Sequence, residues 1–507
     1  MSKNDNENMN VLVIITDQQR NSHMSCSGNK LLKTPHMDSI ADGGVRFTNY
    51  FCNTPICMPN RGSFFTGMLP SEHKTRSNGI NLNPELPLLT KVLAGEGYHT
   101  CNVGKLHFQH LAPRYNRYRK SEPVSLESIF DWWEGNVDIK KTQNYYGFEE
   151  NWLANGHGDV MSGHYFEWLK EQGHDMEDYL SDRARVNKYI DETRLPEELY
   201  PTTWVANETV NYIERTAKGE YGNKPFFLHC SFPDPHQPVC PPGRYKTMYN
   251  PEDVELPANF SDGQKLLEHE FLGKYIKHGF EPVLPTLVDE EFARKFTALT
   301  YGSIAMIDDG IGRVLATLEK SGLAENTMVL FLSDHGDYCG DHALVVKGPA
   351  HFRSVINPPL IWKVPGLTKS SVSDSLVSTI DIPGTILNLL GVERKKQLQR
   401  SQGIDISPIL EDSTKRVRDR CLIEHDEELL HVSRKEAYRL RTLVTEQHRL
   451  TIYDGFENGD IFDYKSDPGE VNDLWSKDEV LKNQLVEELM REIINVQLKY
   501  PTRKSMH

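Results

Sequence analysis

The chain has 507 residues, a hydrophobic content of 38% and a formal net charge of −15. A chain of this length can bury a large core and exceeds what one compact core usually holds, so we expect a large domain over residues 1–400 and a smaller one over residues 401–507. The acidic balance argues against a nucleic-acid partner, because proteins that bind nucleic acids need a basic surface to neutralise phosphates.

Cysteine usage and the two ends of the chain bear on its compartment. The eight cysteines are scattered and include no C-x-x-C pair, which suits a reducing compartment. Near the N-terminus, the apolar run 11–15 is too short for a signal sequence or a membrane span. We therefore expect a cytoplasmic protein without a membrane partner, or a periplasmic or secreted one if a signal peptide has been removed. The polar tail, residues 500–507, could reach a neighbouring subunit in a homo-oligomer.

Three short apolar runs each end abruptly in polar residues, at positions 11–15, 225–228 and 328–332. This pattern is typical of buried parallel strands whose carboxyl ends carry chemistry. Apolar residues at helical spacing predict one helix over 292–318 and a second through 386–390. The alternation of strands and helices predicts an α/β fold with a large, mostly parallel central sheet flanked by helices.

Two other stretches have a different character. Between residues 113 and 201 the periodicity is weak and the aromatic content is high, so we expect insertions draped over the core, where substrate specificity would be decided. After Gly391 the composition becomes charged. Alternating runs at 441–453 and 461–464, followed by a helical pattern over 478–498, predict a smaller C-terminal subdomain of antiparallel sheet plus helix.

The most informative segment runs from Cys57 to Arg61 and reads C-x-P-x-R. A lone cysteine before a helix is usually an ordinary free side chain, but Pro59 and Arg61 make this pattern specific. Here the chain resembles the sulfatase family of the alkaline-phosphatase-like superfamily, in which a formylglycine-generating enzyme oxidises this cysteine. The resemblance covers nearly the whole chain. It implies that the formylglycine hydrate at Cys57 attacks sulfur and that Arg61 offsets its negative charge.

The resemblance also implies one divalent metal at the ends of two strands. Its ligands would be Asp17 and Gln18 after the first predicted strand, Asp334 and His335 after the third, and the modified Cys57. Sulfatases commonly have two adjacent aspartates where this chain has Asp-Gln, and that departure resembles phosphonate monoester hydrolases and choline sulfatases. Ca²⁺ is expected first, with Mn²⁺ or Mg²⁺ as alternatives because one ligand is an imidazole.

Four cationic side chains follow in the order that family sulfatases use to hold the sulfate and the leaving group, namely Lys105, His107, His236 and Lys347. The resemblance implies that the lysines neutralise sulfate oxygens, and we assign His236 as general acid and His107 as general base. Each residue alone is more often solvated or structural, so the ordered set is the stronger signal. Asn78 resembles a substrate-binding position of the phosphonate hydrolases, although Asn-Gly by itself signals a turn.

Three functions remain open at this point. Hydrolysis of a small-molecule or carbohydrate sulfate ester is favoured, because a Lys-x-His pair and a further lysine suit a compact tetrahedral sulfate. A phosphonate monoester or phosphodiester hydrolase with the same nucleophile is the alternative, which the Asp-Gln pair and the histidine ligand favour. A non-catalytic glycan-binding protein is least favoured, because no member of the site is missing.

Overall fold

The computed structural model describes residues 9–111, 124–175, 189–277, 285–430 and 435–497. Its largest element is a nine-stranded sheet in which the central strands are parallel. In spatial order the strands are β12 (Ser371–Ser373), β2 (Val45–Phe47), β11 (Leu360–Lys363), β9 (Thr327–Ser333), β1 (Asn10–Thr16), β7 (Phe226–Ser231), β4 (His99–Gly104), β5 (Glu150–His157) and β6 (Val160–Gly163). Only β11 and β6 run antiparallel to their neighbours within this sheet.

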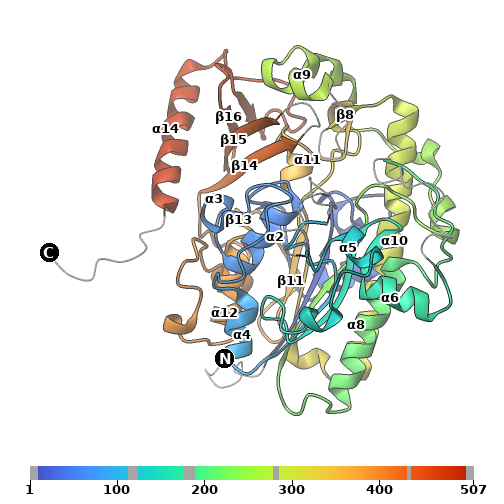
Figure 1. The fold of residues 1–507 in the computed structure, drawn as a ribbon. Helices are drawn as coiled ribbons and strands as arrows, with labels where there is room; N and C mark the ends of the chain where they lie inside the picture. The colour runs from blue at the N-terminus through green and yellow to red at the C-terminus, as the bar shows by residue number, and fades with distance from the viewer. Residues whose placement is uncertain (1–8, 112–123, 176–188, 278–284, 431–434, 498–507) are drawn as a thin grey trace.

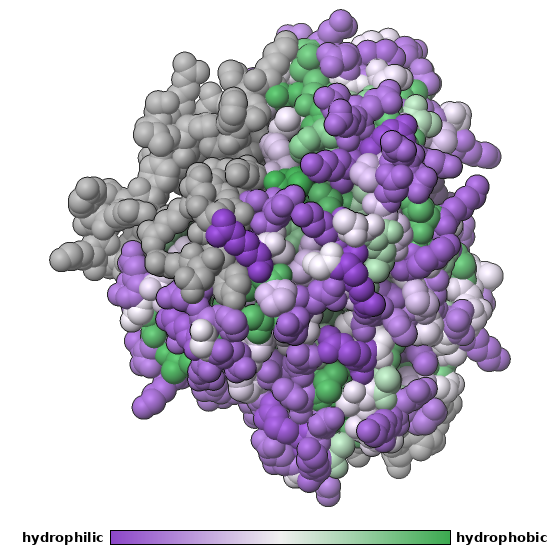
Figure 2. Space-filling model, turned by 90° about the vertical axis from the view of Figure 1, so that its right-hand side faces the viewer, coloured by the Kyte–Doolittle hydropathy of each residue, from purple (hydrophilic) through white to green (hydrophobic). Residues whose placement is uncertain are grey.

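Helices cover both faces of the sheet, because its central strands are apolar on both faces (Figure 1). On one face, Val11 and Val13 of β1 pack with α2 (Cys57–Thr66), α4 (Leu89–Gly95) and α12 (Asp381–Leu389). On the other face, Leu12 and Ile14 pack with α1 (Pro35–Ala41), α8 (Pro201–Ala217) and α10 (Glu290–Lys320). The molecular surface on the α10 side is mostly hydrophilic where it is coloured, as expected for amphipathic covering helices (Figure 2).

The predicted fold class is confirmed. The three predicted strands are β1, β7 and β9, and the helix predicted over 292–318 lies within α10, whose N-cap Asp289 accepts a hydrogen bond from the backbone N–H of Phe292 at 2.8 Å. The helix predicted through 386–390 corresponds to the C-terminal part of α12, which ends at Leu389. Among the described helices, none is both long enough and apolar enough to cross a membrane.

The C-terminal region forms a separate four-stranded antiparallel sheet of β14 (Arg420–Leu430), β15 (Lys435–Thr445), β16 (His448–Tyr453) and β17 (Asp460–Asp463). Against it packs α14 (Glu479–Val496), through Leu485 and Leu489. The backbone N–H of Glu424 in β14 donates to the Asn53 carbonyl at 2.8 Å, so this sheet abuts the segment that leads into α2. The domain boundary at residue 400 stays a prediction, and the tail 500–507 lies outside the described residues.

The stretch 113–201 contributes more to the core than its sequence indicated. β5 pairs in parallel with β4, and β6 pairs with β5, so both strands extend the central sheet rather than cover it. Within the described parts of this stretch, α5 (Ile129–Trp133) and α6 (His164–Glu171) pack beside these strands. The remaining α-helices and strands of the described residues are α3 (Pro70–His73), α9 (Glu270–Lys277), α11 (Arg353–Ile356), α13 (Ser407–Glu411), β3 (Tyr50–Phe51), β8 (Thr286–Leu287), β10 (Leu344–Val345) and β13 (Val377–Ser378).

Candidate active site

The carboxyl ends of the parallel strands meet at one edge of the sheet and bring the two predicted aspartates together. Thr16 of β1 lies opposite Ser333 of β9, and Asp17 and Asp334 follow these residues directly. Gln18 has a φ of 70°, a left-handed conformation that turns the chain sharply after β1. Its backbone N–H donates to Asp334 Oδ1 at 3.1 Å, which ties the two strand ends to each other.

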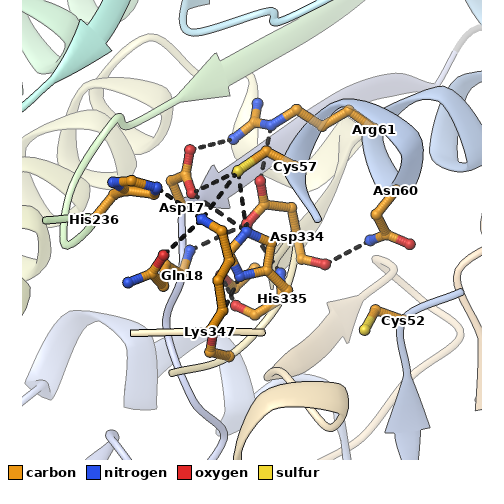
Figure 3. Close-up of polar contacts among 12 residues, drawn as sticks. Asp17, Gln18, Cys52, Cys57, Asn60, Arg61, His236, Asp334, His335 and Lys347 are labelled. Carbon is orange, nitrogen blue, oxygen red and sulfur yellow. Dashed lines mark hydrogen bonds and ion pairs between the residues drawn. The ribbon is translucent and has the colours of Figure 1, made fainter. Parts of the chain in front are cut away.

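Cys57 is the first residue of α2, and the whole helix is buried. One turn along the helix, Asn60 Nδ2 donates to the Asp334 carbonyl oxygen at 2.5 Å, and Arg61 Nε donates to Asp334 Oδ2 at 2.9 Å. The terminal Arg61 nitrogen Nη2 lies 3.6 Å from Asp17 Oδ2. These bonds hold the helix N-terminus against the sheet edge, with the thiol between the two carboxylates (Figure 3).

Asn78 lies beside the same helix N-terminus. Its Oδ1 accepts a hydrogen bond from the backbone N–H of Met58 at 3.1 Å and so satisfies one of the N–H groups that the first helical turn leaves unpaired. The residue is only partly buried. The structure therefore gives Asn78 a capping role that the sequence did not indicate, and its contact with substrate stays a prediction.

Four potential metal-donor groups surround one point in the site. One donor atom each from Asp17, Cys57, Asp334 and His335 lies within 4.8 Å of the others, and all four residues are buried. The Cys57 Sγ is 3.6 Å from Asp17 Oδ1 and 3.1 Å from His335 Nε2 (Figure 3). Two carboxylates, an imidazole and a fourth polar group suit one divalent cation, so the residues present fit the metal that the sequence predicts.

The side chain of Gln18 is held by three partners. Its Oε1 accepts a hydrogen bond from Lys347 Nζ at 2.8 Å, and its Nε2 donates to Gln237 Oε1 and to Asp337 Oδ2, each at 2.6 Å. Asp337 was not singled out from the sequence. It fixes the orientation of the Gln18 amide, so that the oxygen rather than the nitrogen is turned toward Lys347.

Two lysine–histidine pairs face each other in the site. Lys347 Nζ lies 2.7 Å from His236 Nε2, and Lys105 Nζ contacts Asp17 and lies 2.8 Å from His157 Nε2. The rings of His157 and His236 stack with their centroids 3.7 Å apart and 20° between their planes. The two pairs therefore form one continuous group joined by the stacked imidazoles.

His157 was missed by reasoning from the sequence. It is the last residue of β5, in the stretch where periodicity is weak, and no recognisable motif surrounds it. One signal was available in the sequence: His157 ends a short strand-like segment and is followed by the turn residues Gly158 and Asp159. This arrangement resembles the carboxyl ends of the other strands.

His107 follows β4 at the same sheet edge. Its φ of 59° is left-handed, which is unusual for a residue with a side chain of this size. Its ring centroid lies 6.5 Å from that of His157, and its buried Nδ1 has no hydrogen-bond partner among the described residues. The structure thus places His107 next to the histidine stack with one nitrogen available.

Burial disfavours the charged form of the titratable groups in the site, and nearby cations offset this effect for some of the acidic groups. Burial raises the pKa of Asp17, but the positive charges of Lys105, Arg61 and Lys347, led by Lys105, outweigh this effect and hold the pKa well below its ordinary value. Burial and the Asp17 charge raise the pKa of the Cys57 thiol to about 11, so the unmodified thiol is neutral at pH 7. Burial also lowers the pKa of His335 to about 4 and that of His236 well below its usual range, so both imidazoles are neutral.

Comparison with known proteins agrees with this geometry. The family model named Sulfatase matches residues 9–392. The chain belongs to the sulfatase family. A second sulfatase-related model, N-sulphoglucosamine sulphohydrolase, C-terminal, matches residues 340–499, which include the C-terminal sheet.

Individual sulfatases and one related hydrolase resemble the chain over most of its length. It is 28% identical over 480 residues to an arylsulfatase of Clostridium perfringens, with 93% of this chain and 91% of that protein covered. It is 24% identical over 554 residues to an N-acetylglucosamine-6-O-sulfatase of Bacteroides thetaiotaomicron, with 98% and 88% covered. The crystal structure of the phosphonate monoester hydrolase of Agrobacterium radiobacter superposes with a TM-score of 0.79 at 22% identity, covering 98% of each chain. That last likeness shows a common fold.

Proposed function

We propose that this sulfatase-family enzyme hydrolyses a sulfate monoester and that formylglycine formed from Cys57 is its nucleophile. The position of the cysteine carries the proposal. Its Sγ lies within 3.6 Å of Asp17 Oδ1, His335 Nε2 and Lys347 Nζ. A nucleophile at this point lies between the predicted metal ligands and a buried cation that can hold the sulfate group.

The modification and the metal supply chemistry that the encoded side chains lack. Formylglycine, as its hydrate, offers one hydroxyl to attack sulfur and a second whose proton loss releases the sulfate. A divalent cation held by Asp17, Asp334, His335 and the Gln18 amide oxygen would polarise the ester oxygens. The oxygen-rich ligand set favours Ca²⁺, and the imidazole admits Mn²⁺ or Mg²⁺.

The balance of buried charge suits an anionic ester. Arg61, Lys105 and Lys347 contribute three buried positive charges, and Asp17 and Asp334 contribute two negative ones, which leaves a surplus of one that the proposed divalent cation would raise to three. This positive surplus suits the single negative charge of a sulfate monoester, and a phosphonate monoester or a phosphodiester carries the same charge. In the transition state the lysines would stabilise the charge that accumulates on the sulfate and leaving-group oxygens. Arg61 is occupied by the carboxylates and would fix their position.

The histidines are assigned to proton transfer. His236 Nδ1 lies 2.6 Å from the Gln237 carbonyl oxygen, which can only accept, so we place the proton on Nδ1 and let Nε2 accept from Lys347. We propose that His236 accepts at Nε2 the proton that Lys347 donates and, as the general acid, passes it to the leaving alcohol, which leaves Lys347 as the neutral amine. His107, which has a nitrogen without a partner, is proposed as the base that takes a proton from the hydrate.

The substrate class and the alternatives follow from the same residues. The relative named N-acetylglucosamine-6-O-sulfatase supports a sulfated carbohydrate, and the arylsulfatase relative supports a smaller sulfate ester. A phosphonate monoester or phosphodiester hydrolase is the second candidate, which Gln18 and the fold likeness to the Agrobacterium hydrolase favour. A non-catalytic glycan-binding protein is disfavoured, because the nucleophile, the metal ligands and the cations all lie together.

The deciding experiment compares three substrates that release the same phenol: an aryl sulfate, an aryl phosphonate monoester and an aryl phosphodiester. The protein is first assayed by mass spectrometry for conversion of Cys57, then stripped of metal and reloaded with Ca²⁺, Mn²⁺ or Mg²⁺. Cys57→Ala is the control for nucleophile-dependent turnover. Highest kcat/KM on the sulfate supports the proposal, whereas highest kcat/KM on either phosphorus ester assigns the chain to the second candidate. No turnover by converted, metal-loaded protein would favour the glycan-binding alternative.

A further inference from the structure

The loop that carries Lys105 and His107 is held from behind by a buried carboxylate outside the assigned site. Glu127 is completely buried. Its Oε1 accepts hydrogen bonds from the backbone N–H groups of Phe108 at 3.0 Å and Gln109 at 3.1 Å. These two residues directly follow His107, so Glu127 contacts the backbone of this loop rather than any group that would touch substrate.

The bonds to Glu127 explain how His107 keeps an unfavourable backbone. At a φ of 59°, the Cβ of a non-glycine residue crowds its own backbone, and such a residue persists only where its surroundings hold it. Successive N–H groups next to a left-handed residue converge on one side of the chain and form a concavity that attracts an anion. Glu127 places a carboxylate oxygen in that position and so stabilises the left-handed turn.

Further contacts join the same two segments. Leu126 N–H donates to Gln109 Oε1 at 2.8 Å, and Ser125 Oγ donates to the His110 carbonyl oxygen at 2.9 Å. These bonds would keep the segments adjacent in the absence of Glu127, but they lie beyond the left-handed residue and do not fix its φ. Leu82 N–H also donates to the Phe108 carbonyl oxygen at 2.8 Å, but Glu127 is the group that binds the two N–H groups after His107.

We propose that Glu127 is a positioning residue: by binding the N–H groups of Phe108 and Gln109 it holds His107 in the left-handed conformation that directs its imidazole toward the histidine stack. This inference rests on the general-base role proposed for His107 above. A residue needed only to fill space would be apolar here, because Oε2 of Glu127 is buried with no hydrogen-bond partner among the described residues, which is a costly arrangement.

The bonding pattern of Glu127 supplies matched variants. Its hydrogen bonds from Phe108 and Gln109 N–H, and a further one from the Tyr145 hydroxyl at 3.0 Å, are all made to Oε1. Glu127→Gln keeps an oxygen that can accept these bonds, whereas Glu127→Leu keeps the approximate size and removes them. Tyr145→Phe removes one donor to the same oxygen without affecting the bonds to the loop, and it is the control for general disturbance of this cluster.

We expect Glu127→Leu to lower kcat on an aryl sulfate by roughly 100-fold, as displacement of a catalytic group by about 1 Å does, with KM changed less than about threefold. Glu127→Gln should retain kcat within about tenfold and Tyr145→Phe within about threefold, because the bonds to Phe108 and Gln109 remain possible in both. A kcat for Glu127→Gln as low as that for Glu127→Leu would overturn the proposal. If Glu127→Leu does not fold, the test uses the other two variants. A kcat that falls by more than about tenfold in Glu127→Gln, or by more than about threefold in Tyr145→Phe, then overturns the proposal.

A double-mutant cycle with His107→Asn separates positioning from a structural role. If Glu127 acts through His107, Glu127→Leu should cost less than about threefold in the His107→Asn background, since the group it positions is gone. An equal loss in both backgrounds would overturn the inference, because it would show an effect on the fold or on Lys105. Undiminished turnover by His107→Asn alone would instead remove the base assignment, and the inference with it, so the two failures are told apart by the single variant.

Discussion

Replacing Lys347 by methionine should remove most turnover while leaving the fold intact, because methionine resembles the lysine stem and lacks its ammonium group. Lys347 is buried, and its Nζ also lies 2.8 Å from Gln18 Oε1. With its Nζ 3.5 Å from the Cys57 Sγ, the lysine would stabilise an oxyanion at that place by about 5 kcal/mol at an effective dielectric constant of ~20. Loss of one such donor costs about 3–4 kcal/mol in comparable sites, so we expect kcat to fall by roughly 10²–10³-fold.

The assay is the initial rate on an aryl sulfate at saturating metal, with Cys57 conversion equal in both proteins by mass spectrometry. The matched control is Lys363→Met in β11, a partly buried lysine at the opposite end of its strand from the site, which should change kcat less than about twofold. Urea denaturation reports whether each variant folds. A loss of less than about tenfold in folded Lys347→Met protein would refute the electrostatic reasoning, because a cation in contact with the nucleophile cannot contribute so little.

Three other predictions test the fold and the metal. Burial lowers the pKa of His73 beneath α2 to about 3. Between pH 6.5 and pH 5 the unfolded state therefore binds a proton that the folded state excludes, and the free energy of unfolding should fall by ~2 kcal/mol on this account. His73→Gln should remove that part of the pH dependence when the free energy of unfolding is measured by urea titration at each pH. The same change with pH in the variant and the unchanged protein would contradict this prediction. Gly104→Ala should cost more than about 3 kcal/mol in the same titrations, because a Cβ there would lie 1.9 Å from a backbone oxygen at a φ of +103°. Gly79→Ala, at a φ of +88° with open space around it, should cost about 1 kcal/mol, and equal costs would contradict the packing argument. Ca²⁺ at 100 times its Kd should raise the free energy of unfolding of metal-free protein by ~2.7 kcal/mol, which is measured as a rise in melting temperature. Asp334→Asn should reduce this rise at the same Ca²⁺ concentration, and an unchanged rise would exclude Asp334 as a ligand.

The parts of the site that could be predicted are those with a local physical signature. Continuous apolar runs that stop at a polar residue mark buried parallel strands, and Asp17 and Asp334 are each the second residue after such a run. Since the carboxyl ends of neighbouring parallel strands share one edge, the proximity of these aspartates follows from the pattern. Cys57 could be placed near them only through its family resemblance, because nothing local indicates which edge of the sheet a helix N-terminus meets.

The parts that escaped prediction depend on contacts between distant segments. His157 and Glu127 lie in the stretch of weak periodicity, and their roles arise from Lys105 and from the loop after β4, which no local pattern reveals. The strand β14 was missed because its second half is rich in acidic residues that hide the alternation of a strand, and it gains stability from pairing along its length with β15. The capping of α2 by Asn78 is likewise visible only once the two segments are in contact.

The burial of α2 bears on the order in which folding and the proposed modification of Cys57 would occur. Every residue of the C-x-P-x-R segment is buried, and the cysteine is hydrogen-bonded or in contact on several sides. An enzyme that converts Cys57 to the proposed formylglycine would have to reach this buried thiol, so it would act before the sheet and the helix close together. A chain that folds first would keep its thiol. The fraction of active molecules would thus be set during synthesis, by the competition between folding and modification, and later exposure of the folded protein to the modifying enzyme would not raise it.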